Sequence, residues 1–465
     1  MKTLPFGLAG LAIAILLSSL PLHAQETLAE PEASAPLAKL DLKDGDSFVF
    51  LGDSITHQCL YTQYVENYFY TRFPKMRLKF HNAGVGGAKA WDALQRFDED
   101  VASYKPKYVS VLLGMNDGTY QPLKDEVFSK YHADMTTVVK RIRDIGATPI
   151  LMTPTMYDSR AAKLYPRRGR VNPPERLEFY NSVLTYYGTW LRHVAVENGY
   201  GFVDMWGPLN NLTLQARKSD PKFTMIRDAV HPDPPGQVVM AVAMIADLGL
   251  PRALSNIRIT VQSGKSALVR GTGGKVSDLR ATPDGVEFTW LANSLPWVMP
   301  EEAALGAKLT KLGHKHSREA LEIHGLKPGR YELSIDGKVV GIWAAEALSR
   351  HIELQENAKT PQYQQALQVA ELNRERNSGP VRDLRNEWRV FQQWARGKHG
   401  VSPMKPEQVE ALEKRLEGLA DRVKSHRAAA VKIEDKIFEV NQPKPRQYKL
   451  KRVASAKLKK ASPEN

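Results

Sequence analysis

Short, almost continuously apolar segments alternate with longer helix-forming segments between residues 46 and 250. The strand candidates are rich in apolar and β-branched residues and cover residues 47–51, 76–80, 108–113, 149–152 and 201–205. The helix candidates cover residues 55–73, 88–104, 127–145, 175–197 and 237–247. Strands without polar alternation need apolar cover on both faces, and helices of this length supply it. The pattern therefore predicts an α/β domain in which helices sandwich a parallel sheet.

Ligands of such sheets bind beyond the carboxyl ends of the strands, so the loops that follow the strands are where chemistry is expected. Each of four polar segments has an ordinary structural explanation: an N-cap serine, a tight turn, an Asx turn and a polar loop. In chain order they are Gly52-Asp53-Ser54-Ile55-Thr56, Asn82-Ala83-Gly84-Val85-Gly86-Gly87-Ala88, Gly114-Met115-Asn116-Asp117 and Asp228-Ala229-Val230-His231-Pro232.

Together and in this order, the four segments resemble those of the SGNH-hydrolase superfamily, which includes GDSL-type esterases, lipases and carbohydrate deacetylases. The resemblance covers residues 46–250, less than half of the 465-residue chain. It implies a flavodoxin-like parallel sheet and a serine ester hydrolase that needs no metal or organic cofactor.

The resemblance also implies a role for each matching residue. Ser54 would be the nucleophile, His231 the base that removes its proton, and Asp228 the carboxylate that orients the imidazole. The oxyanion hole would use the backbone N–H groups of Ser54 and Gly87 and the side-chain amide of Asn116.

Two alternatives stay open within these assignments. The choice of Gly87 over Gly84 or Gly86 depends on counting from Asn82 through a glycine-rich loop. His57 lies three positions after Ser54 and competes with His231 as the base, although a side chain at that spacing on a helix is expected to point away from the crevice.

A basic segment, residues 157–176, follows the fourth strand and should overhang the same end of the sheet. It carries six basic side chains against two acidic ones. Guanidinium groups suit carboxylate and sulfate oxygens because they donate in a planar fork. We hypothesise that Arg167, Arg168 and Arg170 receive an acidic or sulfated part of the substrate. A solvated surface loop is the simpler interpretation.

The net charge of +14 comes almost entirely from the second half of the chain. Residues 1–250 hold 27 basic and 26 acidic side chains, whereas residues 251–465 hold 38 and 25. The predicted catalytic unit is therefore close to neutral, and the basic balance gives no reason to expect specific nucleic-acid binding. One cysteine, Cys59, excludes an internal disulfide framework and any metal site built from cysteines.

The first 24 residues have the pattern of an export signal, with Lys2, an apolar run over residues 8–20 and a small-residue site at Ala24. The run is short for a membrane span, so we expect no transmembrane span in the mature chain, a flexible leader over residues 25–45 and a secreted or periplasmic protein. An uncleaved anchor is the alternative.

The second half is predicted to hold three parts. Short strands and Gly- or Pro-rich turns indicate a β-rich module over residues 251–350, either a small antiparallel sandwich or a sheet packed on the hydrolase domain. Helix-forming composition indicates an α-helical hairpin over residues 351–440. Residues 441–465 form a basic tail that is expected to be disordered and that could contact an anionic polymer.

The sequence thus predicts a secreted serine esterase that forms an acyl-enzyme and deacetylates O-acetylated carbohydrate. A lipid or thioester acylhydrolase is the enzymatic alternative. An exported polymer-binding protein on a hydrolase scaffold that has lost catalysis is the alternative from another class.

Overall fold

The structure is a computed structural model that describes residues 37, 39–166 and 173–454. Its first sheet contains five parallel strands in the order β2-β1-β3-β4-β5, which is the flavodoxin-like order. The strands are β1 (Ser47–Gly52), β2 (Lys79–Gly84), β3 (Tyr108–Leu112), β4 (Thr148–Met152) and β5 (Gly201–Val203). The predicted fold class of this region is confirmed.

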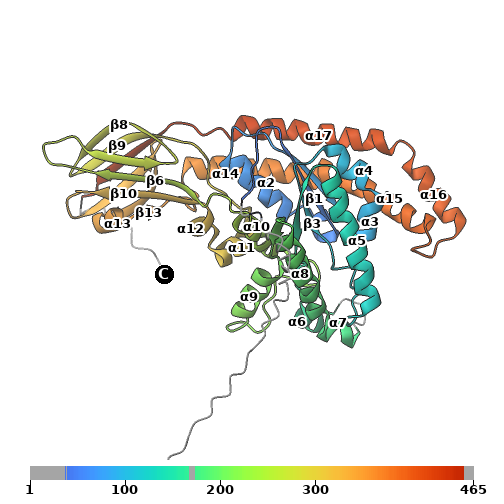
Figure 1. The fold of residues 1–465 in the computed structure, drawn as a ribbon. Helices are drawn as coiled ribbons and strands as arrows, with labels where there is room; N and C mark the ends of the chain where they lie inside the picture. The colour runs from blue at the N-terminus through green and yellow to red at the C-terminus, as the bar shows by residue number, and fades with distance from the viewer. Residues whose placement is uncertain (1–36, 38, 167–172, 455–465) are drawn as a thin grey trace, which may run out of the picture. The chain divides into compact units, whose positions relative to one another are not determined.

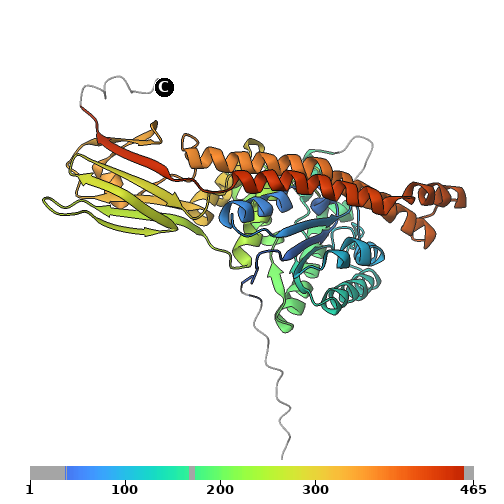
Figure 2. The same ribbon diagram turned by 90° about the horizontal axis from the view of Figure 1, so that it is seen from above.

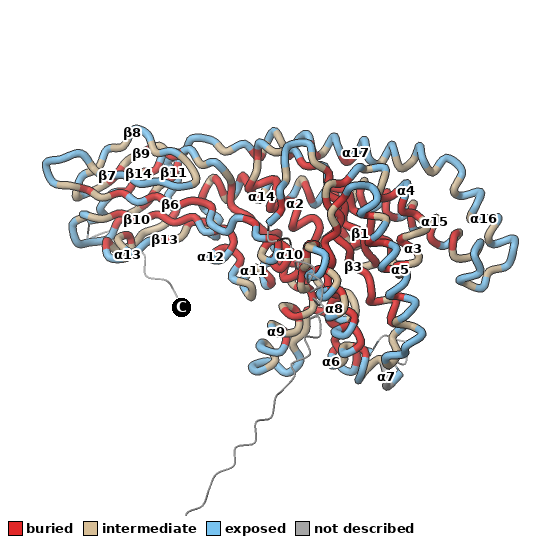
Figure 3. The backbone as a smooth tube through the Cα atoms, in the orientation of Figure 1, coloured by how far each residue is buried: buried red, intermediate tan, exposed pale blue. Residues whose placement is uncertain are grey.

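Successive side chains of the central strand β1 enter opposite cores. Phe48 and Phe50 pack into one apolar cluster, and Val49 and Leu51 pack into the other. Helices α2 (Tyr61–Arg72) and α10 (Pro234–Asp247) cover the first face; α3 (Ala90–Gln95), α5 (Asp125–Asp144) and α8 (Tyr180–Glu197) cover the second. Figure 3 shows the sheet as a buried layer between them. Burial on both faces explains why these strands lack polar alternation.

Three predicted helices are interrupted. The segment predicted as one helix over residues 55–73 forms α1 (Ser54–His57) and α2, because Cys59 between them has a left-handed backbone with a φ of 58°. The segment over residues 88–104 forms α3, α4 (Phe97–Asp100) and the short 3₁₀ turn η1 (Ala102–Tyr104). The segment over residues 175–197 forms α7 (Pro174–Glu178) and α8. Two helices of this domain were not predicted: α6 (Ser159–Leu164) and α9 (Trp206–Ala216).

The β-rich module is a sandwich of two sheets with a shared apolar core. One sheet holds β13 (Ile352–Glu353), β10 (Arg318–His324), β6 (Ala253–Thr260) and β7 (Leu268–Thr272); the other holds β12 (Lys338–Ala344), β11 (Arg330–Ile335), β14 (Arg446–Arg452), β9 (Gly285–Ala292) and β8 (Gly274–Thr282). The second sheet is antiparallel, whereas the first also contains the parallel pair β6 and β10.

Three short helical elements belong to the same stretch: η2 (Glu301–Ala303), α11 (Ala304–Thr310) and α12 (Leu312–His316); α13 (Ala345–Arg350) follows β12. Helix α11 packs so closely on α10 that a side chain at Gly306 would lie 2.3 Å from the carbonyl oxygen of Pro235. This contact joins residues on either side of the boundary predicted at residue 250.

The prediction of a disordered tail over residues 441–465 is wrong for Arg446–Arg452. These residues form β14, which lies between β9 and β11 in the middle of its sheet. Their alternation explains the strand, since Tyr448 and Leu450 are buried in the sandwich while Lys449 and Lys451 face outward. Tyr448 also stacks on Phe288, with the ring centroids 4.9 Å apart. Residues 455–465 lie outside the described part of the chain.

The helical region consists of α14 (Pro361–Arg376), the π-helical turn η3 (Asn377–Val381), α15 (Arg382–Lys398), α16 (Pro406–Leu416) and α17 (Leu419–Val440). Helix α17 runs beside α14 and α15, as predicted for a helical hairpin (Figures 1 and 2). These helices also cover the outer edge of β2, where Arg376 donates a hydrogen bond to the carbonyl oxygen of Phe80. Covering an edge strand in this way removes a surface to which other chains could pair.

The predicted signal segment, residues 1–24, and most of the predicted leader, residues 25–45, lie outside the described residues. Among the residues that are described, no helix has the length and apolar character needed to cross a membrane.

Candidate active site

Ser54 lies at the end of β1, on a turn that excludes larger residues. A side chain at Gly52 would lie 2.1 Å from Oγ1 of Thr56, so a glycine is required there. Asp53 caps α1 by accepting a hydrogen bond from the backbone N–H of Ile55 at 2.9 Å. Burial raises the pKa of Asp53 to about 6. Helix α1 has four residues, which is too short for the aligned peptide dipoles of a full helix to build up beside Ser54.

His231 and Asp228 lie on the loop before α10, and the structure brings them to Ser54. Nε2 of His231 lies 2.8 Å from Oγ of Ser54, and Nδ1 lies 2.7 Å from Oδ2 of Asp228. The other oxygen, Oδ1 of Asp228, accepts hydrogen bonds from the backbone N–H groups of Val230 and His231. The series can therefore carry a proton from the hydroxyl to an imidazole whose orientation is fixed by a carboxylate.

The carboxylate of Asp228 is held in its charged form. Burial alone would raise its pKa, but the hydrogen bonds from the ring and backbone of His231 outweigh burial and lower the pKa well below its usual value. A charged carboxylate at this place favours the protonated imidazole that forms when His231 accepts a proton.

His57, the competing base, is directed elsewhere. It packs near the arginines of α15, and burial together with Arg385 and Arg382 lowers its pKa to about 4. The hydroxyl of Ser54 is paired with His231 instead.

Two loops next to Ser54 are tied together by Asp117, which sequence reasoning did not single out. Its Oδ1 accepts from the N–H of Ala90, at the start of α3, and its Oδ2 accepts from the N–H of Gly114 at the end of β3. Burial raises the pKa of Asp117 to about 7. The only sequence signal was its place in the segment Gly114-Met115-Asn116-Asp117.

The side-chain amide of Asn116 faces the glycine loop. Its Nδ2 donates to the carbonyl oxygen of Ala88 at 3.1 Å and to Oδ2 of Asp53 at 3.5 Å. The hydroxyl of Tyr120 donates to Oδ1 of Asn116 at 3.2 Å, which orients the amide with its nitrogen toward the loop. Tyr120 was not predicted, because no local pattern links it to Asn116.

The other two predicted oxyanion donors have no partner in the described part of the chain. No described atom accepts a hydrogen bond from the backbone N–H of Ser54 or of Gly87. Gly87 has a φ of 73°, a conformation that suits glycine.

A cavity of about 520 Å³ opens beside His231. It is lined by Gln58, Tyr165, Pro166, Arg227, Asp228, His231 and Asp233. The guanidinium of Arg227 lies over the ring of Tyr165, 5.0 Å from its centroid, so a cation and an aromatic face border the site together.

Arg167, Arg168 and Arg170 fall outside the described residues. Within the described part of the same basic segment, Arg160 donates to the carbonyl oxygen of Pro221 and Lys163 pairs with Glu178. These two side chains therefore stabilise the loop.

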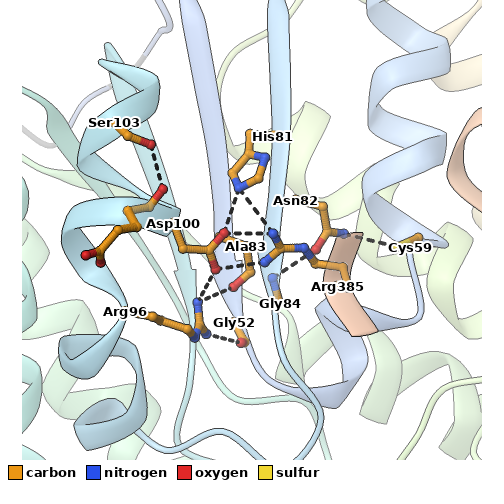
Figure 4. Close-up of polar contacts among 11 residues, drawn as sticks. Gly52, Cys59, His81, Asn82, Ala83, Gly84, Arg96, Asp100, Ser103 and Arg385 are labelled. Carbon is orange, nitrogen blue, oxygen red and sulfur yellow. Dashed lines mark hydrogen bonds and ion pairs between the residues drawn. The ribbon is translucent and has the colours of Figure 1, made fainter. Parts of the chain in front are cut away.

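A buried ionic cluster lies behind the site, among the ends of β1, β2, α4 and α15. Figure 4 shows Asp100 between Arg96 and Arg385, with His81 on the same carboxylate. Arg96 also donates to the carbonyl oxygens of Ala83 and Gly52, where β2 and β1 lead into the loops that carry Gly87 and Ser54. The cluster thus ties α15 to the backbone that carries these loops.

The described residues contain no group of three or more His, Cys, Asp or Glu side chains arranged to hold a metal ion.

Comparison with known proteins identifies a matching family and two related proteins. Residues 50–239 match the model of the GDSL-like lipase/acylhydrolase family. An acetylxylan esterase of Geobacillus stearothermophilus is 25% identical over 232 residues, which are 45% of this chain and 97% of that protein. An uncharacterized lipoprotein, YqeF of Bacillus subtilis, is 36% identical over 74 residues, or 16% of this chain and 30% of that protein.

Among solved structures, BT4096, a gut microbial diltiazem-metabolizing enzyme, is similar over 90% of this chain and 100% of its own. The TM-score is 0.74 and the sequence identity is 25%. The similarity therefore extends beyond the parallel-sheet domain into the β-rich and helical regions.

Proposed function

We propose that this chain, whose residues 50–239 form a serine ester hydrolase domain of the GDSL-like family, removes acetyl groups from O-acetylated carbohydrate through an acyl-enzyme. The observation that carries the mechanism is the hydrogen-bonded series from Asp228 through His231 to Ser54, with 2.8 Å between Nε2 and Oγ. A serine hydroxyl becomes nucleophilic when a base within hydrogen-bond distance accepts its proton.

In the first half-reaction, Oγ of Ser54 attacks the ester carbonyl carbon while Nε2 of His231 takes the hydroxyl proton. The tetrahedral intermediate collapses, the carbon–oxygen bond to the sugar breaks, and His231 gives its proton to the departing sugar oxygen. In the second half-reaction a water molecule gives a proton to Nε2 of His231 and attacks the carbonyl carbon of the acetyl-serine. The bond from that carbon to Oγ then breaks, His231 returns the proton to Oγ, and acetate leaves. Asp228 keeps the imidazole oriented in both halves.

The developing oxyanion would be stabilised by the N–H groups of Ser54 and Gly87 and by the amide of Asn116. The absence of described acceptors for the two N–H groups supports this role. The amide hydrogen of Asn116 that now makes the longer contact, 3.5 Å to Asp53, is the one that would turn to the substrate oxygen.

A carbohydrate ester is favoured over a lipid by the cavity beside His231. Gln58, Arg227 and Asp233 place amide, guanidinium and carboxylate groups on its wall, and such groups hydrogen-bond to sugar hydroxyls. A long acyl chain would need an apolar wall instead. The acetylxylan esterase relative supports the same substrate class.

A substrate panel tests this proposal. We expect the purified protein to release acetate from acetylated xylooligosaccharides, and to hydrolyse 4-nitrophenyl acetate much faster than the octanoate. Diltiazem belongs in the panel because a structurally similar enzyme is named for metabolising it. A higher kcat/KM for octanoate than for acetate would favour the lipid acylhydrolase, and no activity on any ester would favour the polymer-binding alternative.

The basic segment yields a more specific expectation. Replacing Arg167, Arg168 and Arg170 together with alanine should raise KM for an acetylated glycan that contains uronic acids by about tenfold or more, because the loss of even one charge-assisted hydrogen bond costs about 1.5–3 kcal/mol. The KM for 4-nitrophenyl acetate should stay the same. Arg160→Ala is the matched control, because Arg160 belongs to the same segment and its guanidinium donates to the carbonyl oxygen of Pro221. If the triple replacement affects both substrates equally, the three arginines do not bind an acidic part of the substrate.

Export to the periplasm or medium completes the proposal and rests on the signal pattern of residues 1–24. Sequencing the amino terminus of the recovered protein tests it, with a start near Gln25 expected. An intact Met1 would contradict cleavage.

A further inference from the structure

Helix α15 reaches the glycine loop with two side chains. Nε2 of Gln392 donates to the carbonyl oxygen of Gly86 at 3.0 Å, and Nη2 of Arg396 donates to the carbonyl oxygen of Gly87 at 2.7 Å. These contacts join residues more than 300 positions apart in the sequence. Both peptide units that flank the α-carbon of Gly87 are therefore held from a helix far outside residues 50–239.

The contact of Gln392 has a direct geometric consequence. The carbonyl of Gly86 and the N–H of Gly87 belong to one peptide unit, which is planar and trans. In such a unit the C=O and the N–H point in opposite directions. When Gln392 fixes the oxygen on the α15 side, the N–H of Gly87 is fixed on the other side.

The central peptide of the loop has little else to hold it. The N–H of Ala88 closes the turn by donating to the carbonyl oxygen of Val85 at 3.1 Å, but this bond does not involve the Gly86–Gly87 peptide unit. Gly86 and Gly87 have no side chains, and apart from their chain neighbours no described atom lies within 4 Å of where a Cβ of either residue would be. Consecutive glycines are the residues with the most backbone freedom. An unsupported N–H at this place would sample several directions, and preorganisation of a donor is what makes an oxyanion hole effective.

The helix end that supplies the support is itself anchored. Arg396 makes a forked ion pair with Asp92, at 2.7 and 2.6 Å, in addition to its bond to Gly87. Asp92 is buried and accepts a hydrogen bond from the N–H of Lys89, which starts α3. On the same helix, Trp388 is buried in the core of the parallel-sheet domain. The buried side chain of Gln392, which is 4% exposed, therefore extends from a helix whose position is fixed.

We propose that Gln392, supported by Arg396, is a positioning residue for catalysis: it holds the Gly86–Gly87 peptide so that the N–H of Gly87 is presented to the substrate oxyanion. This inference rests on the proposed function, in which that N–H is an oxyanion donor. It makes the helical region a part of the hydrolytic machinery. The hydrogen bond to Gly86 also polarises the shared peptide and strengthens its N–H as a donor.

The test is Gln392→Leu, which keeps the side-chain size and removes the donor. We expect kcat for 4-nitrophenyl acetate to fall by roughly 10- to 100-fold, somewhat less than the loss of a whole oxyanion donor, with KM nearly unchanged. The inhibition constant of a trifluoromethyl ketone, which forms a tetrahedral adduct with an active serine, should rise by the same factor. Gln393→Ala on the exposed neighbouring residue is the matched control and should change neither quantity.

Arg396→Lys provides a second variant in case Gln392→Leu folds poorly. It keeps a cation beside Asp92 and loses the planar fork, so an intermediate loss of kcat at an unchanged melting temperature is expected. An unchanged kcat in both variants would overturn the inference. So would a fall in kcat with no change in inhibitor affinity, because a structural defect away from the oxyanion would act in that way.

Failure of the proposed function gives a different result. In that case the wild-type protein would hydrolyse no ester, or Ser54→Ala would be as active as wild type. Wild-type activity that depends on Ser54, together with a fully active Gln392→Leu, would overturn the positioning role alone.

Discussion

Ser54→Ala is expected to lower kcat for 4-nitrophenyl acetate by on the order of 10⁴-fold or more, with the fold and melting temperature preserved. The alanine removes the one atom, Oγ, that His231 Nε2 contacts at 2.8 Å and that would form the acyl-enzyme. Nothing else at this position is lost, because the cap of α1 is made by Asp53 rather than by the serine. The effect is measured by comparing the rates at which purified wild type and purified Ser54→Ala release 4-nitrophenol.

A double variant sharpens this expectation. Residues that act as one unit show losses that do not add, so Ser54→Ala combined with His231→Ala should be no slower than Ser54→Ala alone. His57→Ala serves as the control for the competing base. It should retain most of the wild-type kcat, since Ser54 is paired with His231. Equal rates for wild type and Ser54→Ala would instead point to a polymer-binding protein or to a contaminating esterase.

The second large effect concerns stability. Asp100→Asn is expected to lower the free energy of unfolding by about 3–5 kcal/mol, because it leaves Arg96 and Arg385 buried without their counter-charge. Both guanidinium side chains and the Asp100 carboxylate are fully buried, and the three meet at 2.7–2.8 Å. Urea denaturation followed by circular dichroism gives the free energy.

Asp98→Asn is the matched control for this change. Asp98 lies two residues earlier and pairs with Arg141, but its side chain is 72% exposed. Exposed pairs contribute little, so its removal should cost less than about 1 kcal/mol. A stability loss that is equal in the two variants would show that the buried cluster contributes no more than a surface pair.

The free energy of unfolding should also depend on pH through the Asp100 carboxyl group. Burial alone would raise the pKa of Asp100, but Arg385, His81 and Arg96 outweigh burial and hold it well below its usual value. Since folding lowers this pKa, the stabilisation is complete above the ordinary value of about 3.9 and is lost as the pH falls from there toward the lower folded value. In Asp100→Asn this part of the acid dependence should disappear.

The parallel-sheet domain could be predicted because its signals are local. Each strand is a short apolar run, and each predicted site residue directly follows a strand or precedes a helix, as Ser54 and His231 do. The order of the four polar segments along the chain then indicated which residue matches each catalytic position of the family. The fold class followed from strand composition, since burial on both faces leaves no polar alternation.

What could not be predicted depends on distant contacts. Gln392, Arg396 and Arg385 lie on an amphipathic helix whose polar residues look like an ordinary solvated face. Their partners are more than 280 residues away, and no spacing rule connects them. Similarly, the basic charge of Arg446–Arg452 predicts a tail, and it obscures the alternation of Tyr448 and Leu450 that makes this segment a strand.

The central place of β14 constrains how the chain is made. Until Arg446–Arg452 leaves the ribosome, β9 and β11 have no strand between them, although both were synthesised more than 100 residues earlier. If the hairpins β8–β9 and β11–β12 form before β14 joins them, their inner edges are open, and open edges are where sheets are prone to pair wrongly. Helices α14 to α17 are made during this interval, so the last seven-residue strand closes the sandwich after they are complete. A chain that lacks Arg446–Arg452 would therefore leave one edge of β9 and one edge of β11 without a partner.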